Sequence, residues 1–221
     1  MRTGKNVHIT IVAKAPVAGR VKTRLCPPCT FEQAADIAAA GLADTIDAID
    51  AIPGIGQARR TLLLDGVAQR WMPDDYAIVP QRGDDLCERL RNGFADLGPG
   101  VITGMETPHV AHLLGAAATL VRNGTDVLGL AEDGGYWAIG LSAATIERLD
   151  EVFDAVPMST PTTGAIQLRR LRSVGARVEL LASARDLDTI DDLYAVATAG
   201  RPGRLPRVAR NVIADLARAP A

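Results

Sequence analysis

The sequence predicts an α/β protein, a single domain with a mostly parallel, twisted sheet and helices on both of its faces. Short apolar runs of strand length alternate with helical patterns almost from end to end, which is typical of strand–helix–strand units. Of the 221 residues, 48% are hydrophobic and 23% are charged, as in ordinary globular proteins, so a disordered chain is excluded. A paired glycine at Gly134 and Gly135 between two apolar runs predicts one antiparallel excursion late in the sheet.

The first half of the chain predicts three strands and two helices. The apolar run at 7–15 predicts a buried strand, and a loop rich in glycine and proline follows it. Apolar residues at helical spacing predict a helix over 31–49, which begins at a capping box of Thr30 and Gln33. Further apolar runs predict strands at 61–64 and 76–79, and a helical pattern follows at 84–97.

The second half continues the alternation. A short apolar run predicts a strand at 101–103. Thr107 as the cap, followed by Pro108 at the first helical position, predicts the start of a helix. That helix is expected to extend through Val121, because apolar residues recur at intervals of three and four. The remaining patterns predict, in order, strands at 126–130 and 136–141, a helix at 163–174, a strand at 177–181 and a helix at 189–199.

Charge and composition exclude several classes of protein. The net charge is −2 and the isoelectric point about 5.9, which argues against a nucleic-acid-binding protein. Residues 201–221 carry five arginines and one aspartate, so we expect a basic helical tail of net charge +4 behind a main domain at 1–200. No run of 18 apolar residues is present, and Met1–Asn6 lack a long apolar segment, so we expect a cytoplasmic protein with no membrane partner.

Cys26 and Cys29 form a Cys-Pro-Pro-Cys sequence. Redox pairs of this spacing usually open a helix, whereas the capping box places both cysteines before it. A zinc site would need further ligands, and no second cysteine pair is present. We therefore expect reduced thiols without a redox or zinc-binding role.

A basic loop follows the first predicted strand. Its cations are Lys14, Arg20, Lys22 and Arg24, and Gly19 allows a close backbone approach. The carboxyl ends of parallel strands are where ligands of open α/β sheets bind, and this loop suits phosphate oxygens. It matches neither the Gly-x-x-x-x-Gly-Lys-Ser/Thr loop nor the Gly-x-Gly-x-x-Gly fingerprint, and a solvated basic loop is the alternative.

Acidic residues follow three other predicted strands. Glu106, after the strand at 101–103, could hold a divalent cation opposite the basic loop if that strand neighbours the first; alternatively it complements a helix dipole. His109 and His112 follow it, and we expect packing or surface roles for them rather than zinc ligation. Among the aspartates at 186–192, Asp188 is the candidate second metal ligand, whereas capping explains one or two others.

Asp133 and the adjacent Gly134-Gly135 pair leave three interpretations open. The carboxylates at Glu132 and Asp133 could bind sugar hydroxyls, act as a base, or form a tight turn. The polar loop at 156–164 looks mobile and could be a lid on the acceptor side.

Taken in order, these motifs closely resemble a known family over about residues 7–193. The matching segments are Ala13–Pro16, Gly19–Leu25, Gly104–Pro108, Ala131–Tyr136 and Asp186–Thr189. They are similar to the bacterial glycosyltransferase-like family found beside radical-SAM and arsenosugar genes. That family has a GT-A, nucleotide-diphospho-sugar transferase type of fold and is a cousin of the molybdenum-cofactor and phospholactate guanylyltransferases.

The resemblance implies a role for each matching position. The Lys14–Arg24 loop would hold the nucleotide phosphates, and Gln81 and Gly83 would lie near the nucleobase. Asp133 would face the sugar or acceptor, with Gly134 and Gly135 beside the substrate, and Asp188 would lie near the metal. Glu106 stands where the family usually has a metal-binding aspartate, so its carboxylate reaches one methylene further.

We therefore expect a transferase that depends on Mg²⁺ or Mn²⁺, with Glu106, Asp133 and Asp188 as catalytic residues and Glu106 and Asp188 as metal ligands. Glycosyl transfer from a nucleotide-diphosphate sugar to a small acceptor is the favoured reaction. Nucleotidyl transfer with release of pyrophosphate is the first alternative, and a catalytically silent nucleotide-binding module is the second. The basic tail carries apolar residues at 208, 212 and 216 that could dock on a partner subunit, so a homodimer is a further alternative.

Overall fold

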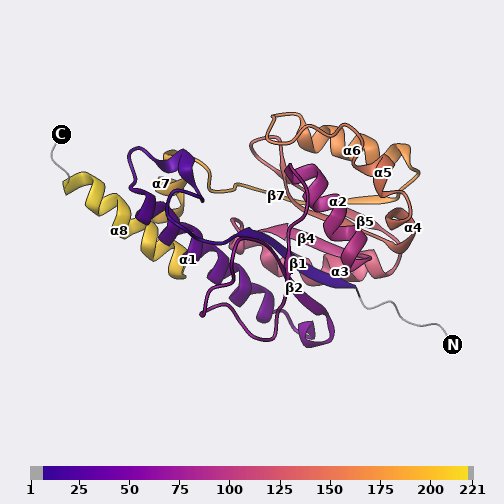
Figure 1. Cartoon of the computed structure of the whole chain (residues 1–221), viewed down its shortest axis with the longest axis horizontal. Helices are drawn as coiled ribbons and strands as arrows, with labels where there is room; N and C mark the ends of the chain where they lie inside the picture. The colour runs from indigo at the N-terminus through magenta and orange to yellow at the C-terminus, as the bar shows by residue number, and fades with distance from the viewer. Residues whose placement is uncertain (1–6, 219–221) are drawn as a thin grey trace.

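A seven-stranded mixed sheet forms the centre of the computed structural model, which describes residues 7–218 (Figure 1). Its order is β3-β2-β1-β4-β6-β5-β7; β6 is antiparallel to β4 and β5, and the other pairs are parallel. This confirms the expected mostly parallel sheet with a late antiparallel strand. The strands are β1 (His8–Lys14), β2 (Arg59–Asp65), β3 (Ala77–Pro80), β4 (Gly100–Gly104), β5 (Asp126–Ala131), β6 (Tyr136–Leu141) and β7 (Val178–Ala184).

Helices cover both faces of the sheet (Figure 1). Side chains of α1 and α3 pack with Ile9 and Ile11 of β1 on one face, whereas α2, α5 and α6 pack with Ile102 and Ile139 on the other. The helices are α1 (Phe31–Asp50), α2 (Leu86–Leu97), α3 (Leu114–Arg122), α4 (Ala143–Ile146), α5 (Leu149–Val152), α6 (Thr163–Ser173), α7 (Ile190–Thr198) and α8 (Arg204–Arg218). Short 3₁₀ helices are η1 (Thr23–Leu25), η2 (Ile55–Gln57) and η3 (Pro108–Leu113).

The register of β1 against β4 positions the site. The two strands are parallel neighbours, with Val12 paired to Gly104, so both end at the same edge of the sheet. The loop after β1 and the loop after β4 therefore begin side by side. Since the chain continues from β1 to β2 on one side and later returns to β4 on the other, this edge is where the strand order reverses, the usual ligand crevice of open α/β sheets.

The helix expected from Pro108 to Val121 is instead a 3₁₀ helix, η3, followed by α3. Thr107 is at the N-cap position with Pro108 directly after it, as predicted, but the Thr107 side chain accepts no hydrogen bond from the backbone. 3₁₀ turns are frequent at the N-termini of α-helices, and here the 3₁₀ part spans six residues before α3 begins. The short helices α4 and α5 were also not anticipated, because four-residue helices carry too little periodicity to detect.

Helix α8 packs against its own chain. Its buried side chains Leu205, Ala209 and Val212 contact a cluster that includes residues of α1 and α7, and Val208 and Leu216 lie at the edge of the same cluster. The apolar positions expected to meet a partner subunit therefore cover this chain's own helices. Within residues 7–218, no helix combines the length and apolar character needed to cross a membrane. Residues 219–221 of the expected tail and Met1–Asn6 lie outside the described residues.

Buried His8 makes stability depend on pH. Its Nε2 bonds to the Gly98 carbonyl at 3.0 Å and its Nδ1 to the Thr10 hydroxyl at 2.8 Å, and burial lowers its pKa from 6.5 to about 4. Between pH 6.5 and pH 4, His8 is protonated in the unfolded chain but stays neutral in the folded chain. The free energy of unfolding therefore decreases as the pH is lowered through this range, by up to about 1.4 kcal/mol per pH unit.

Urea unfolding between pH 7 and pH 4.5 measures this effect. We expect the His8→Gln variant to show a shallower loss of unfolding free energy over that range than the wild type, whatever its stability at pH 7. An identical pH profile in the two proteins would show that His8 does not cause the loss.

Candidate functional site

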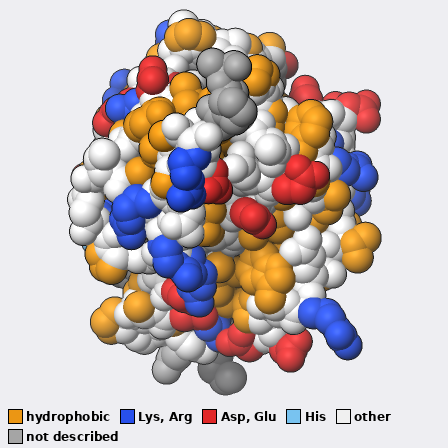
Figure 2. All heavy atoms as spheres, turned by 90° about the vertical axis from the view of Figure 1, so that its left-hand side faces the viewer, with side chains coloured by type: hydrophobic (Ala, Val, Ile, Leu, Met, Phe, Trp, Pro, Cys, Tyr) orange, Lys and Arg blue, Asp and Glu red, His pale blue; other side chains and the backbone are white. Residues whose placement is uncertain are grey.

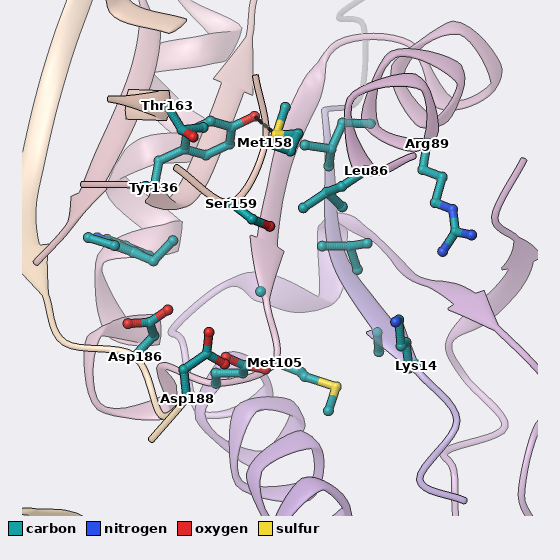
Figure 3. Close-up of a pocket in the computed structure, with 18 of the residues that line it drawn as sticks. Lys14, Leu86, Arg89, Met105, Tyr136, Met158, Ser159, Thr163, Asp186 and Asp188 are labelled. Atoms are coloured by element: carbon teal, nitrogen blue, oxygen red, sulfur yellow. Dashed lines mark hydrogen bonds between the residues drawn. The ribbon is translucent and has the colours of Figure 1, made fainter. Parts of the chain in front are cut away.

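A cavity of about 760 Å³ opens at the carboxyl ends of β1 and β4. Its walls come from the loops after these two strands, the turn between β5 and β6, the start of α2, the segment 158–163, and Asp186 and Asp188 after β7. Figure 2, which views the left-hand side of Figure 1, shows Lys and Arg side chains next to acidic ones near the middle of that face. Figure 3 shows Asp186 and Asp188 together in the cavity near Met105, with Lys14 and Arg89 apart from them.

Lys22 joins the basic loop to the acidic residues. Its Nζ lies 2.5 Å from Glu106 Oε1 and 3.1 Å from Asp188 Oδ1, and it also donates to the Leu187 carbonyl. The Lys22 side chain is only 5% exposed. The expected meeting of the basic loop and Glu106 is therefore present, and it brings together segments more than eighty positions apart.

The other cations of the loop are more accessible. Arg24 contacts Asp188, with 2.7 Å between Nη1 and Oδ2, and its side chain is 66% exposed. Lys14 and Arg20 also line the cavity, and neither forms an ion pair with another residue in the range 7–218. Three exposed cations thus line the same cavity as buried Lys22, and two of them, Lys14 and Arg20, form no ion pair with residues 7–218.

Three carboxylates form an acidic triad in the cavity: Glu106, Asp186 and Asp188 have oxygens that all lie within 4.8 Å of one another. Burial raises the pKa of Glu106, and the Lys22 ammonium opposes this shift. Burial also raises the pKa of Asp186, and the nearby Asp133 and Asp188 carboxylates add to it. A set of hard carboxylate oxygens this close together matches the ligand preference of Mg²⁺ and Mn²⁺.

Asp186 was not singled out from the sequence, although its motif was. The segment 185–188 forms neither helix nor strand, and residues two apart in an extended chain point to the same side. The Asp-Leu-Asp spacing was therefore the signal that Asp186 accompanies Asp188, while the intervening Leu187 is buried in the cluster beneath α7 and α8.

The turn between β5 and β6 combines a polar and a packing role. Asp133 lines the cavity, and its Oδ1 accepts a hydrogen bond from the Gly135 N–H at 2.8 Å. Gly134 has φ +90°, and a Cβ there would lie 2.1 Å from the Pro161 carbonyl oxygen. The structure thus places Asp133 and Gly135 on the cavity wall and Gly134 against the neighbouring loop.

The remaining candidate binding residues lie in different settings. Gln81 lines the cavity, and its Nε2 donates to the carbonyls of Ala13 and Leu63 at 2.8 and 2.9 Å, which fixes the side chain between β1 and β2. Gly83 packs on α2, where a Cβ would lie 2.6 Å from that of Glu88. Gly19 has φ +76° and open space around it, so its role in the described structure is to turn the basic loop.

The segment 156–164, interpreted from its composition as a lid, forms part of the cavity wall in the structure. The Thr163 hydroxyl donates to the Pro157 carbonyl at 2.7 Å, and Gly164 N–H donates to the Gly134 carbonyl at 2.8 Å. The Tyr136 hydroxyl lies 3.9 Å from Met158 Sδ, a contact drawn in Figure 3. The first of these bonds closes the segment on itself, and the other two contacts join it to β6 and the turn before β6.

The histidines and cysteines lie outside the acidic triad. His109 is half-buried and lines a second cavity of about 580 Å³ that shares Glu106 and Asp186 with the first, and burial lowers its pKa. Within residues 7–218, no group of possible metal ligands includes a histidine or cysteine. Cys26 and Cys29 are free thiols before α1, and burial raises the pKa of each.

Comparison with known proteins identifies both a family and a fold. A family model described as an uncharacterized protein conserved in bacteria (DUF2064) matches residues 49–160. The structure is similar to that of a protein from Desulfovibrio desulfuricans G20, provisionally described as a nucleotide-diphospho-sugar transferase, with 22% identity and a TM-score of 0.83. The match covers 96% of this chain and 97% of the other. No curated protein matches the sequence.

Two more distant structures share the fold. A cytidylyltransferase from Leptospira borgpetersenii is 11% identical, with a TM-score of 0.51 and coverage of 96% of this chain and 95% of its own. A homologue of Mycobacterium tuberculosis Rv0371c from Mycobacterium sp. strain JC1 is 18% identical, with a TM-score of 0.52 and coverage of 91% and 97%. At these identities the likeness establishes the fold, and chemistry has to be argued from the cavity itself.

Proposed function

We propose that this chain, which belongs to the DUF2064 family, is a divalent-metal-dependent transferase that uses an activated nucleotide as donor. The favoured reaction is glycosyl transfer from a nucleotide-diphosphate sugar to a small acceptor. The observation that carries the proposal is the 2.5 Å contact between Lys22 Nζ and Glu106 Oε1, because it places a cationic loop and an acidic triad in one cavity. A diphosphate leaves more easily when positive charge lies next to it. The basic side chains of the loop and a divalent cation held by the triad would both supply that charge.

The basic loop would bind the diphosphate. Lys14, Arg20 and Arg24 line the same cavity and are exposed, so phosphate oxygens can reach them. A guanidinium can hold two oxygens at once, whereas an ammonium acts as a point charge. As the bond from the sugar to the diphosphate breaks, its electron pair stays on the departing oxygen, and these side chains stabilise the added negative charge.

The acidic triad fits a divalent cation by the chemistry of its donors. Glu106, Asp186 and Asp188 would hold it, with oxygens within 4.8 Å of one another. When bound, such a cation would act as a Lewis acid that neutralises charge on the diphosphate. The Glu106 carboxylate lies next to those of Asp186 and Asp188, although the resemblance suggests an aspartate at position 106.

Asp133 would position the acceptor. Its Oδ1 accepts a hydrogen bond from the Gly135 N–H, and Asp133 lies on the cavity wall with Tyr136 and the segment 158–163. In the transfer, the acceptor oxygen forms a bond to the sugar carbon as the diphosphate leaves, and its proton passes to the Asp133 carboxylate. Glu132, the other carboxylate of the turn, does not line this cavity.

The second candidate reaction is nucleotidyl transfer, because the fold is shared with a cytidylyltransferase and four cations suit a triphosphate. Product analysis separates the two. Incubation of the protein with Mn²⁺, a panel of nucleotide sugars or nucleoside triphosphates, and a panel of small acceptors should release a nucleoside diphosphate. Pyrophosphate as the product would establish the nucleotidyl reaction instead, and tight binding without either product would indicate a silent module.

Arg24 provides a test of the nucleotide site. The Arg24→Ala variant is expected to bind its nucleotide about tenfold or more weakly, since hydrogen bonds to charged groups contribute about 1.5–3 kcal/mol. Arg218→Ala is the matched control, because Arg218 is also exposed and paired with a carboxylate, Asp215, but lies in α8 and does not line the cavity. Isothermal titration calorimetry measures both. A dissociation constant unchanged in Arg24→Ala would remove Arg24 from the site.

A further inference from the structure

Lys22 occupies an unusual position for a side chain that would bind phosphate. Its ammonium contacts two members of the acidic triad, Glu106 and Asp188, and the Leu187 carbonyl, and its side chain is almost completely buried. The other three cations of the loop are exposed. Lys22 therefore already pairs with two of the three carboxylates to which a divalent cation would bind, and exposed Arg24 pairs with one of them, Asp188.

The backbone around Lys22 is fixed. Lys22 has φ 52°, a left-handed conformation that a residue with a Cβ adopts only when its surroundings require it. Its neighbour Val21 is buried, and the carbonyl of Lys22 accepts a hydrogen bond at 3.0 Å from the N–H of Leu25, which is fully buried. The four-carbon stem of Lys22 is flexible, so its ammonium can turn without a change in the backbone of the loop.

A divalent cation and the Lys22 ammonium compete for the same oxygens. Both would have to share Glu106 Oε1 and Asp188 Oδ1, and two positive centres at such short distances repel each other. An entering diphosphate would give the ammonium another set of oxygens within the same cavity, next to Arg20 and Arg24.

We propose that Lys22 acts as a built-in counter-cation that keeps the acidic triad from binding a divalent metal until a nucleotide diphosphate draws its ammonium away. This inference rests on the proposed function and adds an order of events to it. The site would take metal and nucleotide together rather than metal first, and by linkage each ligand would strengthen binding of the other. Free metal in the cell would then not be held by the empty enzyme.

The test is binding of Mn²⁺ alone, measured by electron paramagnetic resonance and calorimetry on the full chain without nucleotide. The Lys22→Met variant, which keeps the length of the stem and loses the charge, is expected to bind Mn²⁺ at least about tenfold more tightly than the wild type. Lys22→Arg, which keeps the charge, should remain as weak as the wild type. Adding Glu106→Gln to Lys22→Met should reverse the gain, which would locate the ion at the triad.

Lys14→Met is the matched control, since Lys14 lines the same cavity and has no ion pair to the triad within residues 7–218. A gain in Lys14→Met as large as that in Lys22→Met, or no gain in Lys22→Met, would overturn the inference. If the wild type nevertheless binds Mn²⁺ together with a nucleoside diphosphate, the proposed function survives that result. If no variant binds Mn²⁺ with or without nucleotide, both proposals fail.

Discussion

Replacing Glu106 by glutamine is expected to lower metal-dependent turnover by roughly 100-fold or more, because a Lewis-acidic cation contributes several kcal/mol to the stability of a charged transition state. The amide keeps the shape of the side chain but is a poor ligand for a hard cation. It also removes the charge that pairs with Lys22 at 2.5 Å, so the change affects both parts of the site at once.

Turnover against Mn²⁺ concentration, with the donor found by product analysis, measures the effect. Asp150→Asn is a suitable control, since Asp150 is an exposed carboxylate that pairs with Arg91 away from the cavity. Circular dichroism should show both variants folded. Full activity in Glu106→Gln would show that this carboxylate is not a metal ligand.

Replacing Gly134 by alanine is expected to be strongly destabilising. Its φ of +90° disfavours any side chain, and the added Cβ would lie 2.1 Å from the Pro161 carbonyl oxygen, so the segment attached to the turn must move. We expect a loss of about 3 kcal/mol, which lowers the melting temperature of a chain of this size by roughly 10 °C.

Gly19→Ala separates the two causes. Gly19 also has positive φ, +76°, but nothing lies within 4 Å of the position of its Cβ. Calorimetric melting of the two variants should therefore show a much smaller loss for Gly19→Ala. Equal melting temperatures would mean that the contact with Pro161 contributes nothing to stability.

Local patterns predicted the elements that have strong periodicity or caps. The capping box of Thr30 and Gln33 begins α1, and the strand at 136–141 has the expected bounds. The pairing of β1 with β4 was a condition for the site and is present. In contrast, the place of β6 between β4 and β5 depends on contacts between distant segments, which no local pattern encodes.

The site was predictable where charge and strand ends coincide, and less so where packing decides. Lys22 and Glu106 could be placed together because each follows a strand that ends at the same edge. Gly83 and Gly134 share the positive φ of a flexible turn, but only the structure shows that each is pressed against a neighbour, Glu88 and Pro161 respectively. A glycine that permits a close contact and a glycine that faces a ligand look the same in the sequence.

Titration of the protein with a nucleoside diphosphate, with and without Mn²⁺, tests the central claim most directly. If the basic loop and the acidic triad form one metal-dependent nucleotide site, binding should be at least about tenfold tighter with Mn²⁺, and Glu106→Gln should remove that difference. Binding of equal strength with and without the metal, or no binding of any nucleoside diphosphate, would contradict the claim.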